Sequence, residues 1–387
     1  MLRVAILVFL ILSFVSLFAD IAYEGARSIS GPYLELLGAS LVVAGGISLG
    51  ELLSYAARFA GGLLAFRLAS SRAYWALLVL GYTVNLVAVP LLALAGSWEL
   101  ALALYLLERV GKGFRVPIRD TILAEVSAGV GSGKVFALHE LLDQIGGVAG
   151  PLMVAYVASR SGSYKAALAF LAIPAAIAIA LLLLASTLYP EIRSARKPEV
   201  GVRAGLSSEF YTLMLAIALA LASFIHWGQA SYLLSLGGFS GESVALLYAT
   251  AMAVDGLAAV PLGLAFDRWG VRVAALLPIL ALTSTLTLTI AGNPLAFTLL
   301  WGITMGAMEV VPKALVARLV REEYRSLAYS ILFISMGAGW AAGNMLVAYL
   351  NPYTWSSTAI VALSAALSLI LILRASQAEE GGAPLRR

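Results

Sequence analysis

The sequence predicts an all-α polytopic membrane protein with twelve transmembrane helices in two pseudo-symmetric six-helix halves. Of its 387 residues, 61% are hydrophobic and 12% are charged, and the mean hydropathy is +0.94. Soluble globular chains carry about 25% charged residues, so this composition excludes an ordinary soluble protein. Apolar segments long enough to span a bilayer recur along the chain, and the second half repeats features of the first.

Twelve apolar segments separated by short polar breaks predict the twelve helices. They span residues 3–29, 34–66, 73–94, 97–126, 132–158, 164–188, 207–236, 242–266, 271–292, 294–320, 325–350 and 353–374. The first resembles a signal peptide, because Arg3 precedes an apolar run, but its removal would break the symmetry of the halves. We therefore predict an N-terminal half over 1–188, a linker over 189–206, a C-terminal half over 207–374 and a tail over 375–387.

Lysine and arginine predict the orientation of these helices. If the N-terminus is cytoplasmic, the termini, the linker and the loops on that side hold sixteen cations, whereas the opposite loops hold three. This bias predicts a multi-pass protein of the cell membrane with both termini in the cytoplasm. The net charge of +4 therefore reflects topology, and it does not indicate nucleic-acid binding.

Six residues at an offset of 193 indicate an internal duplication. The matches are Gly146 with Gly339, Ala149 with Ala342, Gly150 with Gly343, Val154 with Val347, Ala155 with Ala348, and Tyr156 with Tyr349. The fifth and eleventh helices are therefore predicted to be duplicates. Paired six-helix halves with a binding site between them are typical of alternating-access transporters. We expect Gly146 and Gly150 to allow close helix packing and Pro151 to permit a bend.

The fourth predicted helix carries six charges within an otherwise apolar span. They are Glu108, Arg109, Lys112, Arg115, Arg119 and Asp120. Four of the six share one narrow stripe of the helix. Each charge would cost about 3 kcal/mol at the centre of a bilayer, so the stripe must face protein or water.

Helix depth suggests which of these charges take part in proton coupling. At 1.5 Å per residue, Glu108 and Arg109 lie roughly 15 Å deep, and Asp143 of the fifth helix lies at a similar depth. We expect Asp143 to pair with Arg109 or Lys112, so that a proton could break the pair and shift a conformational equilibrium. A static salt bridge between two helices is the alternative. The proton-coupling candidates are Asp20, Glu108, Arg109, Lys112 and Asp143.

Further polar side chains could line a substrate cavity. They are Glu24, Glu51, Arg115, His139, Glu140, His226, Gln229, Asp255 and Glu309. His139 and Glu140 form a titratable cluster with Asp143 that suits a proton relay, although a lone helical histidine is more often a core residue.

Several of these candidates have a structural alternative. Glu24 could form a surface pair with Arg27, and Glu309 precedes Lys313 by four residues, the favourable order for a self-neutralising helix pair. The seventh helix carries a polar aromatic patch of His226, Trp227, Gln229 and Tyr232. That patch could contact substrate or form an interfacial belt.

Two motifs resemble those of the major facilitator superfamily. Gly263-x-x-x-Asp267-Arg268-x-Gly270-x-Arg272 resembles its loop signature, whereas the counterpart after the second helix has Arg67 in the acidic position. Arg109-x-x-Lys112-Gly resembles its fourth-helix signature, with lysine in place of glutamine. The resemblance covers nearly the whole chain and implies that Arg109 takes part in proton coupling.

The fifth helix adds a motif that bears on direction. Gly146-x-x-x-Gly150-Pro151 resembles a superfamily pattern found mostly in exporters that work by exchange. Asp20, Glu24, Glu51 and the charged fourth helix are also similar to an uncharacterised prokaryotic subgroup of the superfamily. This resemblance implies an exporter-like transporter.

The loop signature also predicts a cytoplasmic gate. Its candidates are Arg119, Asp120, Asp267, Arg268, Arg272 and Arg318. We expect Asp267 to pair with Arg318 at the end of the tenth helix.

The combined prediction is a secondary active transporter that exports a small organic solute in exchange for protons. The cationic excess of the fourth helix favours an anionic group on the solute, whereas the acids could instead serve cation or metal export. Proton-coupled or facilitated uptake is a further alternative.

A membrane enzyme or receptor is the other class of function. The chain has no cysteine and no Walker motif, and its two histidines lie 87 residues apart. We predict no cofactor, metal site or enzymatic activity, and a monomer. The few Asn and Gln residues suggest a thermophilic source.

Overall fold

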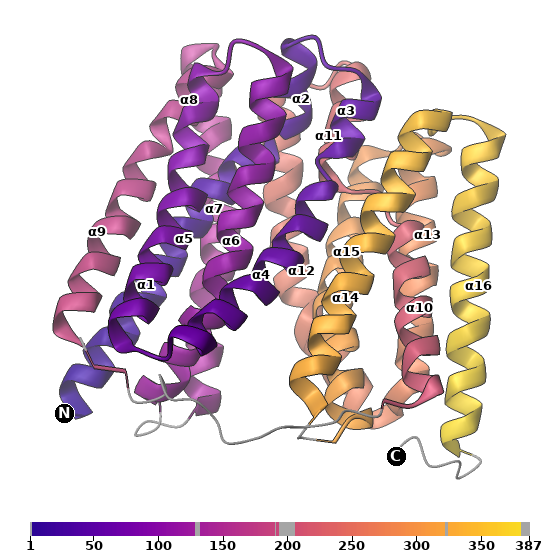
Figure 1. The fold of residues 1–387 in the computed structure, drawn as a ribbon. Coiled ribbons are helices and arrows are strands. Elements are labelled where there is room, and N and C mark those ends of the chain that lie inside the picture. The colour runs from indigo at the N-terminus through magenta and orange to yellow at the C-terminus, as the bar shows by residue number, and fades with distance from the viewer. Residues whose placement is uncertain (1, 128–131, 190, 193–205, 322–323, 381–387) are drawn as a thin grey trace. The chain divides into compact units, whose positions relative to one another are not determined.

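A computed structural model describes residues 2–127, 132–189, 191–192, 206–321 and 324–380, and over these residues the chain is helical, without strands (Figure 1). The first half contains α1 (Leu2–Ser28), α2 (Ser30–Leu36), α3 (Leu41–Gly46), α4 (Leu49–Leu68), α5 (Ser71–Leu91), η1 (Leu92–Leu94), α6 (Trp98–Ser127), α7 (Ser132–Ser161), α8 (Tyr164–Phe170) and α9 (Ala172–Leu188). The second half contains α10 (Ser208–Ala222), α11 (Trp227–Leu236), α12 (Gly241–Trp269), η2 (Gly270–Ala275), α13 (Leu276–Thr289), α14 (Pro294–Leu319), α15 (Arg325–Leu350) and α16 (Trp355–Glu380).

These elements confirm the all-α polytopic fold and its twelve predicted spans. Nine stretches of the described chain are long and apolar enough to cross a membrane, and one of them, Gly241–Thr289, covers both α12 and α13. The two remaining spans are α4 and α6, whose charged side chains lower their hydropathy below that of a simple lipid-facing helix. The charged side chains of these two spans must be shielded from lipid.

The second, sixth and seventh spans are broken into α3 and α4, α8 and α9, and α10 and α11. At the third break, the carbonyl oxygen of Phe224 accepts from the indole N–H of Trp340 at 2.9 Å, and that of Ile225 accepts from the indole N–H of Trp301 at 3.0 Å. The backbone N–H of Ile225 donates to the hydroxyl of Thr285 at 3.0 Å. A break at membrane depth is tolerated because buried side chains satisfy the freed backbone groups.

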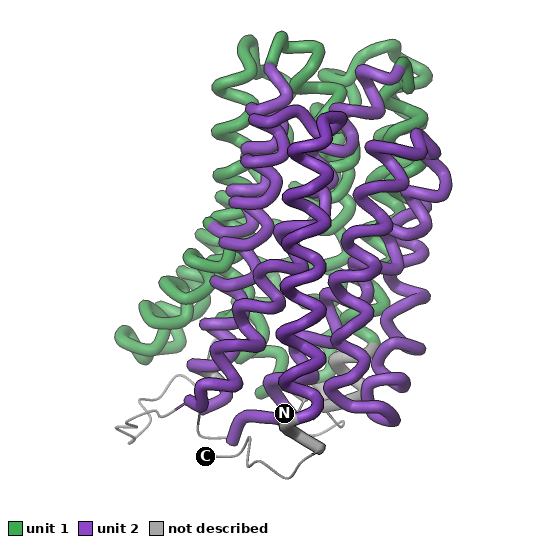
Figure 2. Tube along the Cα trace, turned by 90° about the vertical axis from the view of Figure 1, so that its right-hand side faces the viewer, with its two compact units in different colours: residues 1–39, 53–199, 238–249 green, residues 40–52, 200–237, 250–387 purple. Residues whose placement is uncertain are grey.

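The chain forms two compact units that follow the two halves of the sequence except for two exchanged segments. Unit 1 comprises 1–39, 53–199 and 238–249, and unit 2 comprises 40–52, 200–237 and 250–387 (Figure 2). The start of α12 therefore packs with the first half, and α3 with the first residues of α4 packs with the second half.

Glycines bring helices into close contact in the same way in both units. In unit 1, a Cβ added to Gly146 or Gly150 of α7 would lie 2.6 or 2.4 Å from a carbonyl oxygen of α1. In unit 2, a Cβ added to Gly339 or Gly343 of α15 would lie 2.1 or 2.2 Å from a carbonyl oxygen of α10. The helices predicted to be duplicates thus make equivalent contacts, with two small residues four positions apart.

Candidate functional site

A line of polar residues runs along the contact between α1 and α6 in unit 1, and we call it the polar seam. Its α1 members are Ser16, Asp20, Tyr23, Glu24 and Arg27, and its α6 members are Glu108, Arg109, Lys112, Arg115 and Arg119. The α1 positions recur every three or four residues, so they share one face of the helix. Ser16 contacts Arg119, and Glu24, further along α1, contacts Lys112, which comes earlier in α6. The polar faces of α1 and α6 therefore run antiparallel.

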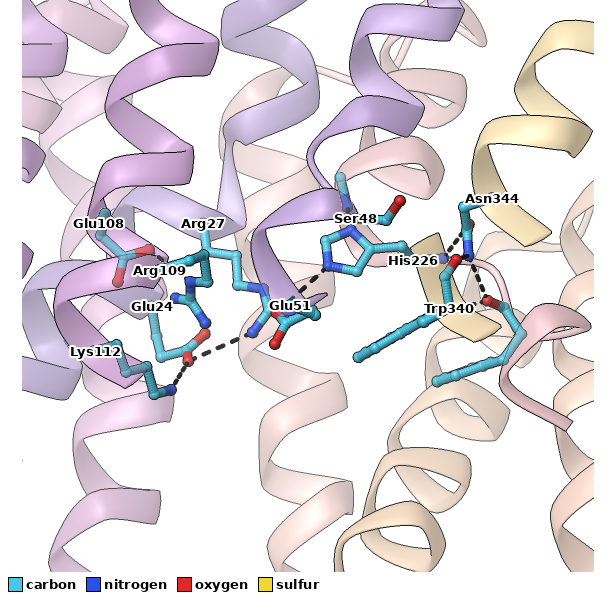
Figure 3. Close-up of polar contacts among 12 residues, drawn as sticks. Glu24, Arg27, Ser48, Glu51, Glu108, Arg109, Lys112, His226, Trp340 and Asn344 are labelled. Carbon is cyan, nitrogen blue, oxygen red and sulfur yellow. Dashed lines mark hydrogen bonds and ion pairs between the residues drawn. The ribbon is translucent and has the colours of Figure 1, made fainter. Parts of the chain in front are cut away.

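Glu24 joins three elements at one carboxylate. One oxygen lies 3.4 Å from the ammonium of Lys112 and 3.7 Å from the guanidinium of Arg27 (Figure 3). The other oxygen accepts a hydrogen bond from the hydroxyl of Tyr248 on α12 at 2.5 Å. Glu24 and Arg27 are only 4% and 8% exposed, so the alternative of a surface pair is wrong.

Tyr23 connects an acid to three cations. Its hydroxyl donates a hydrogen bond to the carboxylate of Asp20. The ammonium of Lys112 lies 4.1 Å from the centre of its ring, and the guanidinium carbons of Arg109 and Arg115 lie 5.2 and 5.9 Å away. These distances allow cation–π attraction, so one phenol side chain links Asp20 to the cations of α6.

Glu108 and Arg109 neutralise one another beside α5. The Nε of Arg109 lies 2.6 Å from one carboxylate oxygen of Glu108, and the side-chain amide of Asn85 donates to the other oxygen at 2.6 Å. All three residues are buried. A charge pair inside a membrane protein is stable only with such additional hydrogen bonds.

Asp143 pairs with Arg119, so its predicted pairing with Arg109 or Lys112 is wrong. Its carboxylate lies 3.7 Å from the guanidinium of Arg119 and 3.7 Å from the ring of His139. The 30 residues of α6 span about 45 Å, so a residue about 15 Å from its first end is not level with one about 15 Å from the opposite membrane face. Eight residues separate Arg119 from the end of α6 and eleven separate Asp143 from the start of α7, which places them about 12 and 16 Å from those ends.

Arg119 consequently belongs to the polar seam. Its guanidinium also donates to Ser16 at 3.2 Å and lies 2.9 Å from Asp120, whose side chain is exposed. The ring of His139 lies between the hydroxyls of Ser13 and Ser16, at 3.3 Å from each. His139 is buried, whereas Glu140 is exposed.

A second polar cluster lies in unit 2. The Nδ1 of His226 accepts from the backbone N–H of Gly228 at 3.0 Å, so neutral His226 carries its proton on Nε2, which faces Glu51 at 3.7 Å (Figure 3). The side-chain oxygen of Asn344 accepts a hydrogen bond from the backbone N–H of His226 at 2.7 Å. The rings of Trp340 and His226 pack edge-on.

The aromatic patch of the seventh span is internal. His226, Trp227, Gln229 and Tyr232 are all buried. The alternative of an interfacial belt is therefore wrong. His226 caps the start of α11, and the side-chain amide of Gln229 makes no hydrogen bond to any residue that the structure describes.

The remaining candidates of the second half do not gather into a site within the described residues. Asp255 is fully buried in α12, where Gly306 of α14 approaches its carbonyl oxygen. Glu309 is half-buried, and no ion pair joins it to the exposed Lys313 in the part of the chain that the structure describes.

The expected gate pair is not formed among the described residues. Asp267 is exposed, and no ion pair joins it to Arg318. The guanidinium of Arg318 instead lies over Gly270, which has a φ of +60°. A Cβ at position 270 would lie 3.1 Å from that guanidinium, so the absence of a side chain at Gly270 leaves room for Arg318. Arg268 and Arg272 lie at the same end of α12 and in η2, with the first over the ring of Trp269.

Several polar and aromatic residues that contact the charged residues and His226 were not identified from the sequence. They are Ser13, Ser16, Tyr23, Tyr82, Asn85, Tyr248, Trp340 and Asn344. The helical spacing of Ser13, Ser16, Asp20 and Tyr23 could have indicated the α1 stripe. Within the described residues, no group of three His, Cys, Asp or Glu side chains could hold a metal ion.

Comparisons with known proteins agree with this architecture. Residues 212–385 match the family model described as Major Facilitator Superfamily. Uncharacterised proteins of Mycobacterium tuberculosis and Mycobacterium bovis are 35% identical over 376 residues, which cover 93% of this chain and 90% of each relative.

Solved transporter structures share the fold at low identity. A POT family transporter in complex with 5-aminolevulinic acid has a TM-score of 0.78 at 12% identity and covers 98% of this chain and 96% of its own. A nucleoside transporter has a TM-score of 0.73 at 15% identity, with 95% and 98% covered. A bacterial homologue of the human lysosomal transporter Spinster has a TM-score of 0.69 at 14% identity, with 95% and 94% covered. With its duplicated halves, its loop signature and its full-length relatives, this chain belongs to the major facilitator superfamily of membrane transporters.

Proposed function

We propose that this transporter is a secondary active exporter that exchanges a small organic solute for protons by alternating access. It acts as a monomer in the cell membrane, with both termini in the cytoplasm. The observation that carries the proposal is the polar seam, which brings acids and cations together on helices of one unit. Its acids are Asp20, Glu24 and Glu108, joined by Asp143 of α7, and its cations are Arg27, Arg109, Lys112, Arg115 and Arg119.

A proton on one of these acids changes the charge pairing of the whole seam. Asp20 and Asp143 act on one another electrostatically, and both act with Arg115. Protonation of either carboxylate removes one negative charge from the seam, and protonation of Asp143 also removes the acidic group that lies 3.7 Å from Arg119, so that this guanidinium can reorient. Proton binding shifts the equilibrium between two conformations only if the two conformations differ in proton affinity.

Export by exchange is supported by the position of the fifth-helix motif. Gly146 of α7 packs directly against Asp20: a Cβ there would lie 2.8 Å from the Cβ of Asp20. α7 continues as a helix through Pro151 at the end of the same motif. The motif that resembles exchange exporters therefore packs against Asp20, one of the acids that we assign to proton exchange.

Proton-coupled uptake is the second candidate, and the pairing of the cations favours it. Arg109, Lys112 and Arg119 each have an acidic partner. An anionic solute that takes one of these cations displaces the acid, and the displaced acid becomes free to bind a proton. Solute and proton would then move together.

Substitution of Asp143 tests proton coupling. A thermal-shift screen of purified protein against a solute library at two pH values supplies a transported compound. In liposomes, an imposed proton gradient should drive that solute, a protonophore should abolish the drive, and Asp143→Asn should reduce gradient-driven flux about tenfold or more. Glu99→Gln, which alters an exposed acid at the start of α6, is the matched control and should keep the wild-type flux. Flux that ignores the proton gradient would refute proton coupling.

A further inference from the structure

Arg115 is the one cation of the polar seam without an acidic partner within hydrogen-bonding or ion-pair distance in the described chain. Its side chain is 1% exposed, and its Nε and Nη1 are buried and make no hydrogen bond to the described residues. By contrast, Arg109 contacts Glu108, Lys112 contacts Glu24, and Arg119 contacts Asp143. A buried guanidinium with unmet donors is costly, and arginine has no acceptor capacity, so an anionic acceptor is the group that would satisfy it.

Two tyrosines hold this guanidinium in place. Its central carbon lies 3.9 Å from the centre of the Tyr82 ring on α5 and 5.9 Å from that of Tyr23 on α1. Gly81 brings α5 against the base of the same side chain, since a Cβ there would lie 2.8 Å from the Cβ of Arg115. A guanidinium stacked on an aromatic ring keeps its N–H edge available, which suits recognition of a planar oxyanion.

Lys112 provides the accessible approach to this position. Its ammonium lies over the ring of Tyr23, which Arg115 also approaches, but its side chain is 26% exposed. An anion arriving at Lys112 therefore stands one helical turn from Arg115 on the same stripe of α6. The acids within electrostatic reach of Arg115, Asp20 and Asp143, form no ion pair with it within 4 Å in the described residues.

We propose that Arg115, with Lys112 at its entrance and Tyr23 and Tyr82 as its aromatic walls, binds an oxyanion group of the transported solute. This inference rests on the proposed transport function and names its substrate class. Carboxylates and phosphates share the required chemistry, a planar or compact group of acceptor oxygens with negative charge.

Binding of simple oxyanions to the purified full-length protein tests the proposal. The probes are acetate, benzoate and inorganic phosphate, and acetamide and benzamide are the uncharged matches of the first two. We expect calorimetric binding of an oxyanion but not of its amide, weakened about tenfold or more in Arg115→Gln and less in Arg115→Lys, which keeps the charge. The control Arg67→Gln removes an exposed cation at the end of α4 and should bind as the wild type does.

The outcomes separate this proposal from the proposed function. Equal binding of amide and oxyanion, no binding of any oxyanion, or unchanged affinity in Arg115→Gln would overturn the oxyanion site. If Arg115→Gln does not fold, an affinity in Arg115→Lys identical to the wild type overturns it as well. Binding that depends on Arg115 in a protein whose solute flux ignores the proton gradient would instead refute proton coupling and leave the oxyanion site standing.

Discussion

Asn85 connects α5 to the polar seam through a single amide. It donates to the carboxylate of Glu108 at 2.6 Å and to the carbonyl oxygen of the same residue at 3.1 Å. The contact orients Glu108 toward Arg109, because one carboxylate oxygen is held by each partner. An uncharged side chain thus determines how a buried charge pair is arranged.

Removal of this amide should destabilise the protein. Asn85→Ala leaves a buried carboxylate oxygen without its donor, at a cost of about 1.5–3 kcal/mol. A lowered midpoint of thermal unfolding in detergent would show the loss. Ser284→Ala is the matched control, since this buried hydroxyl has no hydrogen-bond partner among the described residues and its removal should leave the midpoint nearly unchanged. Equal midpoints for both variants would contradict this account of Asn85.

The charged residues of the site were identifiable from the sequence, but their partners were not. A charge in an apolar helix is conspicuous because of its cost, which is why Asp20, Glu24 and Lys112 were found. Tyr23 and Tyr248 were missed because polar aromatic side chains in a membrane helix are ordinary until the register of neighbouring helices is known. Asp143 lies beside Arg119 and not Arg109 because α6 and α7 each span about 45 Å, so equal distances from opposite ends of the two helices do not mean equal depth.

Helix contacts at glycine define the equivalent packing of α7 on α1 and of α15 on α10. A methyl group at position 150 would lie 2.4 Å from a carbonyl oxygen, and one at position 343 would lie 2.2 Å from another. Gly150→Ala and Gly343→Ala should each cost about 1–3 kcal/mol, because the helices must separate. Thermal unfolding measures this cost.

The control for both variants is Gly96→Ala. An added Cβ at position 96 has no neighbour within 4 Å, so its unfolding midpoint should stay close to that of the wild type. If Gly150→Ala and Gly343→Ala were as stable as Gly96→Ala, the close approach of these helices would be contradicted.

The twelve spans were predictable because a bilayer requires about twenty apolar residues for each helix. The interruptions were not. The break between α10 and α11 depends on indole groups of α14 and α15, more than seventy residues away along the chain. Local hydropathy contains no information on such partners, so the seventh span was predicted as one continuous helix.

At the scale of the whole molecule, the exchanged segments were also invisible to the sequence. Residues 40–52 and 238–249 each belong to a span of one half and pack in the unit of the other half. Composition and periodicity assign them to their own half, since only tertiary contacts show the exchange. Both segments contribute to the polar clusters, through Glu51 to His226 and through Tyr248 to Glu24.

The orientation in the membrane can be tested on a background free of cysteine. Tyr353→Cys places a thiol in an exposed loop between α15 and α16, and Arg67→Cys places one at the exposed end of α4. With both termini in the cytoplasm, an impermeant maleimide added to intact cells should label the first variant and not the second. Labelling of Arg67→Cys before lysis would reverse the predicted orientation.

A pH-sensitive dye trapped inside liposomes tests the central claim most directly, because it reports proton movement during downhill flow of a transported solute. If the transporter exchanges solute for protons, solute that leaves the lumen should be replaced by protons, and the lumen should acidify. Asp143→Asn should abolish that acidification, whereas Glu99→Gln should preserve it. Alkalinisation of the lumen would establish the co-transport of the second candidate. A lumenal pH that is the same with wild type, with Asp143→Asn and without protein would contradict a proton-coupling role for the polar seam.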